Sequence, residues 1–255
     1  MSSIGTGYDL SSTTFSPDGR VFQVEYAHKA VENSGTVLGV ACKDGVVLAV
    51  EKIVTSKMLV PGTLRRLHIL DQHAALGVCG LLADGRQLVN VGRNDCANYL
   101  EVYQEVIPGR LLADRLAMWV HMYTMRVWIR PFGCSVLIAS YEETEGPRLY
   151  MIEPSGMCYR YYGCAVGKGK TASKTQLEKF DFAQLSARDA IKELAKILLD
   201  AHDDAGDKSY EVEMLWVCDE SGKKSQMVPK DLVEEATRLA KEARQRDDED
   251  MDEDS

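Results

Sequence analysis

The chain has 255 residues, of which 45% are hydrophobic and 27% charged, and its formal net charge is −9 at pH 7. These values are typical of an ordinary globular protein with room for a substantial core. Residues 247–255 hold seven acidic groups and no basic one, which leaves a net charge of −2 on the rest of the chain. A body this close to neutral argues against a nucleic-acid-binding protein, because such proteins need a basic surface.

The seven cysteines are scattered along the chain without a C-x-x-C pair. This pattern predicts reduced thiols and a location in the cytoplasm and nucleus. Residues 1–7 contain no apolar run and no basic segment, so we expect no signal peptide. We also expect no membrane partner, because no 18-residue apolar stretch occurs.

The chain opens with residues 1–14, which are rich in Ser, Thr and Gly and have little to bury. We expect them to form a mobile N-terminal tail. In residues 15–27, Ser16, Pro17 and Gly19 suit a type I turn, and a short amphipathic helix follows directly. A helix of about three turns is marginal alone, so it must pack on its own domain or on a neighbouring subunit.

Two apolar runs, 36–42 and 46–50, are joined by Lys43-Asp44-Gly45, which is typical of a hairpin. Because both runs are continuously apolar, they predict a sheet covered on both faces. The remaining periodicities predict strands at 67–70 and 74–79, helices at 81–103 and 110–128, strands at 134–141, 148–152 and 159–162, helices at 168–180 and 187–205, a strand at 210–218 and a helix from Pro229.

This order of elements favours an α+β fold of antiparallel sheets with helices packed outside, over a parallel doubly wound fold. The sequence has no internal repeat and no Pro- or Ser-rich linker. We therefore expect a single domain over residues 15–246. The acidic residues 247–255 are expected to be a disordered tail, with a docking surface for basic partners or phosphorylation of Ser255 as open alternatives.

A glycine-rich segment, 167–171, reads Gly-Lys-Gly-Lys-Thr and invites comparison with a phosphate-binding loop. The motif requires Gly, four residues, then Gly-Lys-Thr, but Cys164 stands where the first Gly belongs and Gly163 is one place off. We therefore expect an exposed helix entry and no nucleotide. The chain has no regular histidine ligand spacing, no cysteine cluster and no Gly-x-Ser-x-Gly elbow. These observations predict no metal, no cofactor and no serine hydrolase of that type.

Residues 15–27, F-S-P-D-G-R-V-F-Q-V-E-Y-A, resemble the N-terminal signature of proteasome alpha-type subunits. Many residue types at fixed spacing make this signature far more specific than a lone glycine motif. Tyr8-Asp9-Leu10, where most members have Tyr-Asp-Arg, and the acidic C-terminal end resemble one subtype of the family. Other family landmarks are matched at residues 43–47, 80–84, 130–135 and 149–156.

The resemblance implies a four-layer αββα sandwich of two antiparallel sheets between helix layers, the N-terminal nucleophile hydrolase-like fold. It implies a non-catalytic subunit in a ring of seven different alpha subunits, stacked on a ring of catalytic beta-type subunits. Such rings close an axial pore with their N-terminal tails and bind regulatory particles in ubiquitin- and ATP-dependent protein degradation. Residues 1–14 would be this chain's gate tail.

The resemblance also assigns two groups of site residues. The residues that match the family's gate-open cluster are Tyr8, Asp9, Pro17 and Tyr26. Those that match the pockets between adjacent alpha subunits, where the C-terminal tails of activators insert, are Glu25, Gly35, Arg66 and Leu81. Arg66 replaces a lysine common at this place, which keeps the positive charge for a terminal carboxylate but changes its geometry.

An enzymatic alternative rests on Gly35-Thr36, because beta-type subunits mature by cleavage between a Gly and a Thr. The freed threonine is then the nucleophile, and its α-amino group serves as base. Aligning residues 44–47 with the beta-type hairpin, however, places Gly35 at the nucleophile position. The same register puts Glu51 where an Asp is expected and Arg66 where a catalytic Lys is expected. We therefore expect no catalytic residue in this chain.

Overall fold

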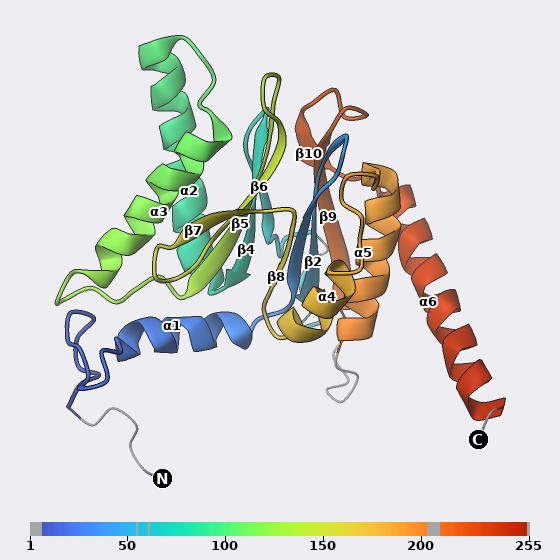
Figure 1. Ribbon diagram of the computed structural model, residues 1–255, viewed down its shortest axis with the longest axis horizontal. Coiled ribbons are helices and arrows are strands. Elements are labelled where there is room, and N and C mark those ends of the chain that lie inside the picture. Colours follow the sequence, from blue (N-terminus) through green and yellow to red (C-terminus); the bar gives the residue numbers. More distant parts are fainter. Residues whose placement is uncertain (1–6, 55, 61, 203–209, 254–255) are drawn as a thin grey trace.

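The computed structural model describes residues 7–54, 56–60, 62–202 and 210–253. Along these residues, groups of strands alternate with helices (Figure 1). The elements are α1 (Phe22–Glu32), β1 (Val37–Ala41), β2 (Gly45–Ile53), β3 (Leu67–Asp71), β4 (Ala74–Gly80), α2 (Leu82–Tyr103), α3 (Gly109–Thr124), β5 (Cys134–Glu142), β6 (Gly146–Ile152), β7 (Cys158–Tyr161), β8 (Gly163–Val166), α4 (Lys170–Leu177), α5 (Ala187–Ala201), β9 (Tyr210–Cys218), β10 (Ser225–Met227) and α6 (Lys230–Glu253).

The strands form two five-stranded antiparallel sheets stacked face to face (Figure 1). The first sheet has the order β10-β9-β2-β1-β8, and the second has the order β3-β4-β5-β6-β7. Helices α5 and α6 cover the outer face of the first sheet, and α2 and α3 cover the outer face of the second. This arrangement confirms the predicted α+β class and the four-layer αββα sandwich.

Successive residues of the central strands point into different cores, which explains their continuous apolarity. In β2, Val46, Leu48 and Val50 face the layer between the sheets, whereas Val47 and Ala49 face α5 and α6. A strand buried on both faces loses the alternation of apolar and polar residues that marks a half-exposed one. The prediction from the two apolar runs is therefore confirmed.

Helix α1 crosses one end of the sandwich instead of joining either helix layer (Figure 1). Its buried residues, Phe22, Ala27 and Val31, form one face, and it packs against β4 and β5. The short helix that needed support thus obtains it from the second sheet of its own domain. On its outer side Tyr26 is exposed and Glu25 is half-buried.

Two short strands, β8 and β10, were not predicted. The chain leaves β7 at the edge of the second sheet and enters β8 at the edge of the first after a single residue, Tyr162. Four-residue strands are too short to show a period, so no local pattern marks this change of sheet.

Several helix bounds also differ from the prediction. Helix α3 ends at Thr124 and not at the predicted residue 128. At this end the Thr124 hydroxyl donates to the carbonyl oxygen of His121 at 2.7 Å. Helix α4 is shorter than the predicted 168–180, and α5 ends at Ala201. The last residues of the predicted helix 187–205 lie outside the described residues.

The predicted boundary at 247 does not coincide with the end of an element, because α6 continues to Glu253. Residues 247–253, expected to be disordered, are therefore helical. Extending a helix that is already nucleated adds one hydrogen bond per residue and needs no apolar face. The predicted mobile tail lies partly outside the described residues, which begin at Gly7, and Ser255 lies outside them as well.

We predict that Leu149→Ala lowers the free energy of unfolding by about 2–5 kcal/mol, the cost of a buried Leu-to-Ala cavity. Leu149 is fully buried between the sheets, and one of its methyl carbons lies 2.9 Å from where a side chain on Gly39 would begin. Urea denaturation of the isolated subunit measures the effect.

The matched control is Leu10→Ala, because Leu10 is 86% exposed. This substitution should change the free energy of unfolding by less than about 0.5 kcal/mol. Equal effects of the two substitutions would contradict the assigned core.

Candidate functional site

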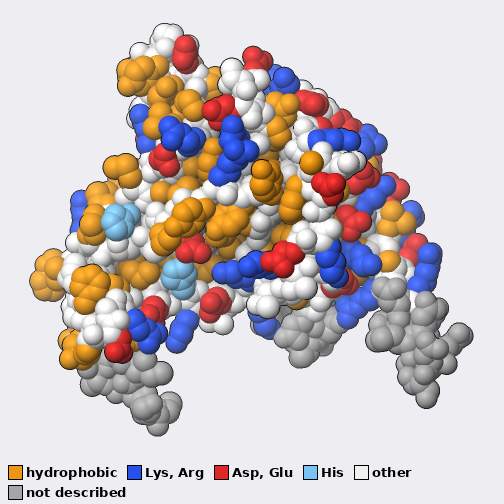
Figure 2. Space-filling view, viewed as in Figure 1, with side chains coloured by type: hydrophobic (Ala, Val, Ile, Leu, Met, Phe, Trp, Pro, Cys, Tyr) orange, Lys and Arg blue, Asp and Glu red, His pale blue; other side chains and the backbone are white. Residues whose placement is uncertain are grey.

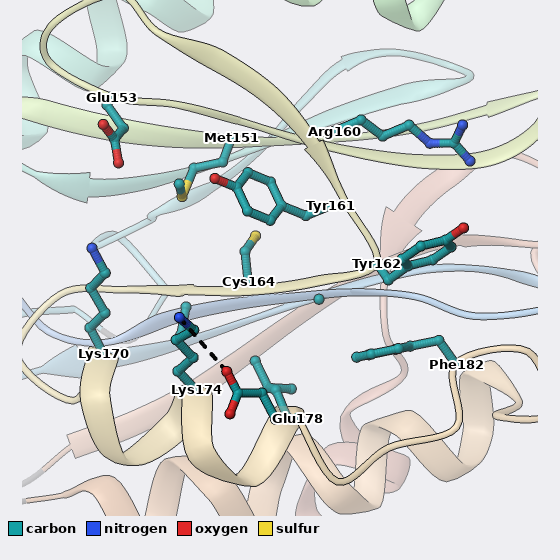
Figure 3. A pocket seen from close by; sticks show the side chains of 13 residues that line it. Met151, Glu153, Arg160, Tyr161, Tyr162, Cys164, Lys170, Lys174, Glu178 and Phe182 are labelled. Carbon is teal, nitrogen blue, oxygen red and sulfur yellow. Dashed lines mark ion pairs between the residues drawn. The ribbon is translucent and has the colours of Figure 1, made fainter.

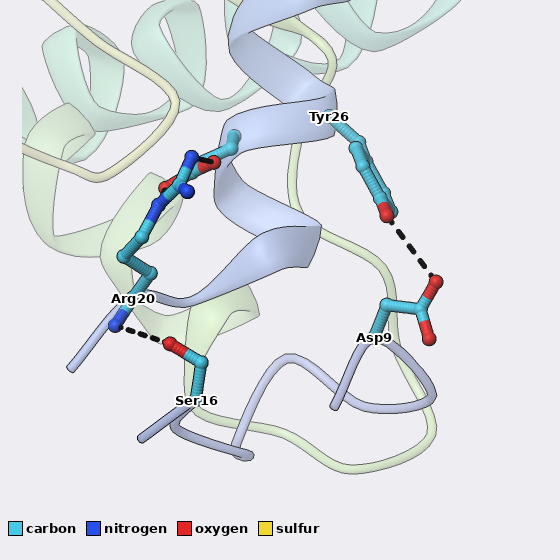
Figure 4. Close-up of polar contacts among 5 residues, drawn as sticks. Asp9, Ser16, Arg20 and Tyr26 are labelled. Atoms are coloured by element: carbon cyan, nitrogen blue, oxygen red, sulfur yellow. Dashed lines mark hydrogen bonds and ion pairs between the residues drawn. The ribbon is translucent and has the colours of Figure 1, made fainter. Parts of the chain in front are cut away.

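The turn before α1 is closed by three hydrogen bonds around Ser16 (Figure 4). The amide of Gly19 donates to the Ser16 carbonyl at 2.9 Å, as expected for a β-turn over 16–19. The amide of Arg20 donates to the Ser16 hydroxyl at 3.0 Å, and the Ser16 amide donates to the Arg20 carbonyl at 2.9 Å. Pro17 stands at the second position of this turn, so its fixed φ supports the same geometry.

The proposed gate cluster is only partly assembled. The Tyr26 hydroxyl donates to Asp9 Oδ2 at 3.2 Å (Figure 4). Gln23 Nε2 donates to the Asp9 carbonyl. Desolvation and the contact with Asp9 raise the pKa of Tyr26, so its hydroxyl stays protonated and able to donate. Tyr8 is exposed, and Pro17 belongs to the turn. Among the four predicted residues, all of them described, the hydrogen bond found joins Asp9 and Tyr26.

Three of the four predicted pocket residues converge at the end of β4. Arg66 Nη1 donates to the carbonyl of Gly80 at 3.2 Å, directly before Leu81, which is half-exposed. The thiol of Cys79 donates to the Gly35 carbonyl at 3.5 Å. Gly35, Arg66 and Leu81 therefore lie around the same two residues of β4.

Arg66 keeps part of its guanidinium uncommitted within the described structure. Its Nε is buried without a hydrogen-bond partner there, while Nη1 also contacts the carbonyl of Val78 at 3.4 Å. Burial lowers the pKa of Arg66, but a guanidinium stays charged in proteins. The Nε and Nη2 edge matches the two oxygens of a carboxylate.

Glu25, the fourth predicted pocket residue, has a different partner. Both of its oxygens accept from Arg20, with the Nε contact at 2.6 Å. The hydrogen bond from Arg20 holds the pKa of Glu25 below its ordinary value. This pair lies on the outer side of α1, so Glu25 is committed to the turn and not to the contacts around Gly80.

A contact that sequence reasoning missed fixes the start of α2. Arg130 donates to both oxygens of Asp84, at 2.6 and 2.8 Å, and the Gly133 amide donates to Asp84 Oδ2 at 2.8 Å. Burial acts to raise the pKa of Asp84, but the hydrogen bonds from Arg130 and Gly133 leave it below 3.8. The sequence offered one sign of this contact: the landmark 80–84 contains an acidic residue, Asp84, and the landmark 130–135 contains a basic one, Arg130.

The Gly35–Thr36 junction is buried and fully engaged. Thr36 is 1% exposed, its amide donates to Glu51 Oε2 at 3.3 Å, and its hydroxyl accepts from the Gly169 amide at 3.1 Å. A side chain on Gly35 would begin 2.5 Å from the carbonyl oxygen of Glu51, closer than real Cβ contacts come. The position aligned with the nucleophile of catalytic relatives therefore accepts only glycine.

His202, expected to be structural or at the surface, supports this junction from the end of α5. Its Nδ1 contacts Glu51 Oε1, and its ring lies 4.2 Å from that of Tyr210, measured between centroids. Glu51 thus connects the first strand pair to the end of α5. This pairing leaves no sign in the sequence, because 151 residues separate the two side chains.

The glycine-rich loop before α4 uses its amides within the protein. Lys168 donates to the carbonyl of Ser34 at 3.0 Å, Gly169 to Thr36, and Lys170 to the carbonyl of Gly167 at 3.2 Å. A phosphate cradle needs such amides to be free. The loop therefore locks the Gly35–Thr36 junction, which is a structural role.

A cavity of about 460 Å³ opens between the edges of the two sheets and α4 (Figure 3). Tyr161, Tyr162 and Phe182 line it, and Lys174 pairs with Glu178 at 3.7 Å. Cys164 is buried, and this burial raises the pKa of its thiol far above the usual range, so the thiol is not a nucleophile. This cavity holds none of the predicted site residues.

The described residues contain no group of three or more His, Cys, Asp or Glu side chains arranged to hold a metal ion. Within the same residues, no helix is both long and apolar enough to cross a membrane. All seven cysteines lie in the described residues and are free thiols, six of them buried.

The two stacked sheets, with a threonine locked inside the chain at the first strand, define a sandwich of the N-terminal nucleophile hydrolase-like class. The family model for proteasome subunits matches residues 31–217, and the model for the N-terminal signature of the A-type proteasome subunits matches residues 8–30. The chain therefore belongs to the proteasome subunit family, as an alpha-type member.

Similar proteins include the alpha type-3 proteasome subunits of three organisms. The Acanthamoeba castellanii protein is 57% identical over 98% of this chain and 99% of its own length. The Oryza sativa subsp. japonica protein is 56% identical over 95% and 97%, respectively. The Spinacia oleracea protein is 55% identical over 94% and 96%. The chain thus resembles the type-3 subunit over most of its length.

We predict that Asp84→Asn lowers the free energy of unfolding at pH 7 by roughly 1–2 kcal/mol, discounted because Arg130 is 61% exposed on its side chain. Because folding lowers the pKa of Asp84, its carboxylate stabilises the fold fully at a pH above the ordinary pKa of 3.8. This stabilisation is lost as the pH falls through the lowered pKa of the folded protein. Urea denaturation at several pH values should show the difference shrinking below pH 3.8.

A suitable control is Glu178→Gln, which removes an exposed pair with Lys174. We expect a change below about 0.5 kcal/mol at every pH. If Asp84→Asn lowered the free energy of unfolding equally at every pH, the negative charge assigned to the Asp84 carboxylate would be contradicted.

Proposed function

We propose that the protein is a non-catalytic subunit of the alpha ring of the proteasome core particle. In this role it contributes to ring assembly, to pore gating through its N-terminal tail and to docking of regulatory particles in ubiquitin- and ATP-dependent protein degradation. The observation that carries the proposal is the Gly35–Thr36 junction, which is buried in the core and hydrogen-bonded to Glu51. Membership of the alpha-type group supports it.

The enzymatic alternative requires a threonine with a free α-amino group that acts as base. In this chain the Thr36 nitrogen is an amide that donates to Glu51, and the Thr36 hydroxyl is turned toward Gly169. Cleavage at this junction would also have to reach a bond between two buried residues.

Exposed apolar side chains support assembly with neighbouring subunits. Figure 2 shows such side chains gathered at the lower left, where Figure 1 places the N-terminal segment and the end of α3. Leu10, Phe15, Val127 and Trp128 are exposed by 86%, 69%, 53% and 95% of their surface. Large exposed aromatic and aliphatic side chains at one place are typical of protein interfaces. The partners in this proposal are other alpha subunits of a heteroheptameric ring and beta-type subunits of the adjacent ring.

The gating role rests on a contrast within residues 8–12. Asp9 and Ser12 are tied to α1 and to the chain after α3, whereas Tyr8 and Leu10 are exposed. A segment held by a few polar contacts is easily moved, because little apolar area is lost when it leaves. The docking role rests on Arg66, because its positive charge suits the terminal carboxylate of an activator such as a regulatory particle ATPase.

The proposed location is the cytoplasm and the nucleus. Free thiols that are mostly buried suit a reducing compartment, in which no disulfide is needed for stability.

We expect the protein to purify within a particle of several subunits and to keep an uncleaved N-terminal region. Native mass spectrometry of the endogenous complex tests both points at once, because it gives the partners and the mass of each chain. A mature chain that begins at Thr36, or a protein that stays monomeric, would contradict the proposal.

Deleting residues 2–12 should raise the basal peptide hydrolysis of the assembled particle, because the deletion removes the tail and its contacts at Asp9 and Ser12. Hydrolysis of a fluorogenic peptide by reconstituted particles measures the effect. The matched control is the double substitution Ser2→Ala and Ser3→Ala, which keeps the length of the tail. An unchanged rate in the deletion would refute a gating role for this tail.

A further inference from the structure

Strand β9 lacks a strand neighbour along part of one side, at residues 211–213, called the open edge. Strand β2 pairs with β9 along its whole length, but β10 on the other side pairs only with Leu215–Val217. The Val228 amide donates to the Met214 carbonyl at 3.0 Å and extends this contact by one residue. Within the part of the chain that the structure describes, no strand pairs with β9 at the open edge.

The backbone of Val212 points outward at the open edge. In an antiparallel pair the N–H and C=O of one residue point to the same side of the strand, and this side alternates along the chain. Because the Met214 carbonyl accepts from Val228, Val212 directs its own N–H and C=O the same way, two residues earlier. Backbone groups in this position are a template on which another chain can pair.

A cavity of about 670 Å³ lies along the same edge. Its lining includes four consecutive residues of β9, Glu211–Met214, together with Met227, Val228 and one face of α6. Successive side chains of a strand point to opposite faces of the sheet, so a cavity that touches all four residues lies at the edge and not over one face. Strand β10 has only three residues, and its shortness leaves this space beside β9.

The two ends of the cavity differ in chemistry. Met214, Val228 and Val233 are buried or half-buried and line the cavity where β10 ends and α6 begins. Arg238 and Lys241 line it further along α6, and Lys241 lies about 12 Å beyond Val233 at 1.5 Å per residue. Lys241 has no ion-pair partner among the described residues, and Arg238 has an exposed contact with Glu242 at 3.8 Å. One end is therefore apolar and the other basic.

We propose that the open edge binds an extended peptide segment of a partner protein that is not a subunit of the particle. The segment adds a strand beside β9, with apolar side chains at the β10 end and acidic side chains at the Lys241 end. In such strand addition the main-chain hydrogen bonds supply affinity, and the side-chain contacts supply selectivity. The inference goes beyond the proposed function, because the cavity contains no residue of the gate cluster or of the activator pocket.

The charges around the cavity select an acidic occupant. The α6 wall carries three basic residues and one acidic residue, namely Lys230, Arg238, Lys241 and Glu234. On the opposite wall Glu211 already pairs with Lys52 at 3.0 Å. Complementary charge of this kind favours one class of partner over others and fixes its direction in the site.

The acidic end of this chain does not fit the cavity. Helix α6 is continuous to Glu253 (Figure 1), so the acidic residues 247–253 are helical. The backbone of a helix bonds within the helix itself and has no row of free groups to offer an edge. The occupant therefore comes from another molecule.

The probe for this site is the synthetic peptide V-T-V-S-E-S-E with a fluorescent label. As a strand it presents two valines and then two glutamates on one face. Fluorescence anisotropy measures its affinity for the full chain and for core particles reconstituted with that chain. The charge-reversed peptide V-T-V-S-K-S-K should bind at least tenfold more weakly, and equal binding of the two peptides would contradict an acidic occupant.

Two N-methylated forms of the probe separate strand addition from simple attraction of charges. One form carries methyl groups on the amides of the odd positions and the other on those of the even positions, so each loses the donors of one edge. Because an added strand pairs through one edge, one form should bind at least tenfold more weakly than the probe and the other within about threefold. Equal binding of both forms would overturn the inference.

Lys241→Glu should weaken binding of the probe at least fivefold, because the glutamates of the peptide then meet a like charge. The matched control is Lys192→Glu, which changes an exposed lysine of α5 outside the cavity and should leave the affinity within about twofold. Equal losses in the two variants would show attraction to the overall charge and not to this site.

Val212→Pro removes the amide donor at the open edge, and proline is tolerated in a strand where the N–H faces away from the ladder. We expect at least fivefold weaker binding, whereas Val212→Ala keeps the donor and should stay within about threefold. An unchanged affinity in folded Val212→Pro would refute pairing at this residue. If Val212→Pro does not fold, the N-methylated forms and Lys241→Glu decide.

Two further outcomes identify a different occupant and overturn the inference. If the full chain binds the probe but core particles do not, a neighbouring subunit covers the open edge. If the full chain self-associates in sedimentation experiments and Val212→Pro separates the copies, a second copy occupies the edge. Binding to the full chain does not depend on the proposed function, so failure of the chain to enter a particle would contradict that function alone.

Discussion

The hydrogen bond from the Thr36 amide to Glu51 fixes how α1 meets the first strand. Glu51 also contacts His202 at the end of α5, and the Thr36 hydroxyl accepts from Gly169 before α4. The junction between the N-terminal region and the sandwich is thus bound to β2, α4 and α5 at once. Because both Gly35 and Thr36 are buried, the chain before them leaves the sandwich in a fixed direction.

This fixed junction gives α1 its position across the end of the sandwich, where the helix supports the N-terminal segment through Tyr26 and Gln23. A catalytic relative uses the same place for a free threonine amine, so one site cannot serve both purposes. Gly35 makes the choice irreversible in this chain, because a side chain there would collide with the backbone of Glu51. In the role proposed for this chain, the same junction that lacks a free threonine amine also supports the segment before α1.

Much of the fold follows from local patterns in the sequence. The apolar runs in β1 and β2 reveal a sheet buried on both faces, and the Ser16–Gly19 turn is visible from residue types alone. The change of sheet between β7 and β8 is not visible, because it takes one residue and both strands are short. Arg130 with Asp84 and His202 with Glu51 also escape prediction, since a contact between distant residues has no periodic signal. The contact between Glu25 and Arg20 was not predicted either, although the two residues are only five positions apart.

Chain crossings without side chains set how closely several segments of this protein pack. Gly35 meets the backbone of Glu51, Gly167 meets that of Gly35, and Gly80 meets that of Gly133, each at a distance that would exclude a Cβ atom. The first two crossings bring the segment before β1 into backbone contact with β2 and with the end of β8, and the third joins the end of β4 to the start of β5. A rotamer change cannot relieve a clash at such a point, because backbone meets backbone. Glycine at these positions is therefore what allows the Gly35–Thr36 junction and the end of β4 to pack as they do.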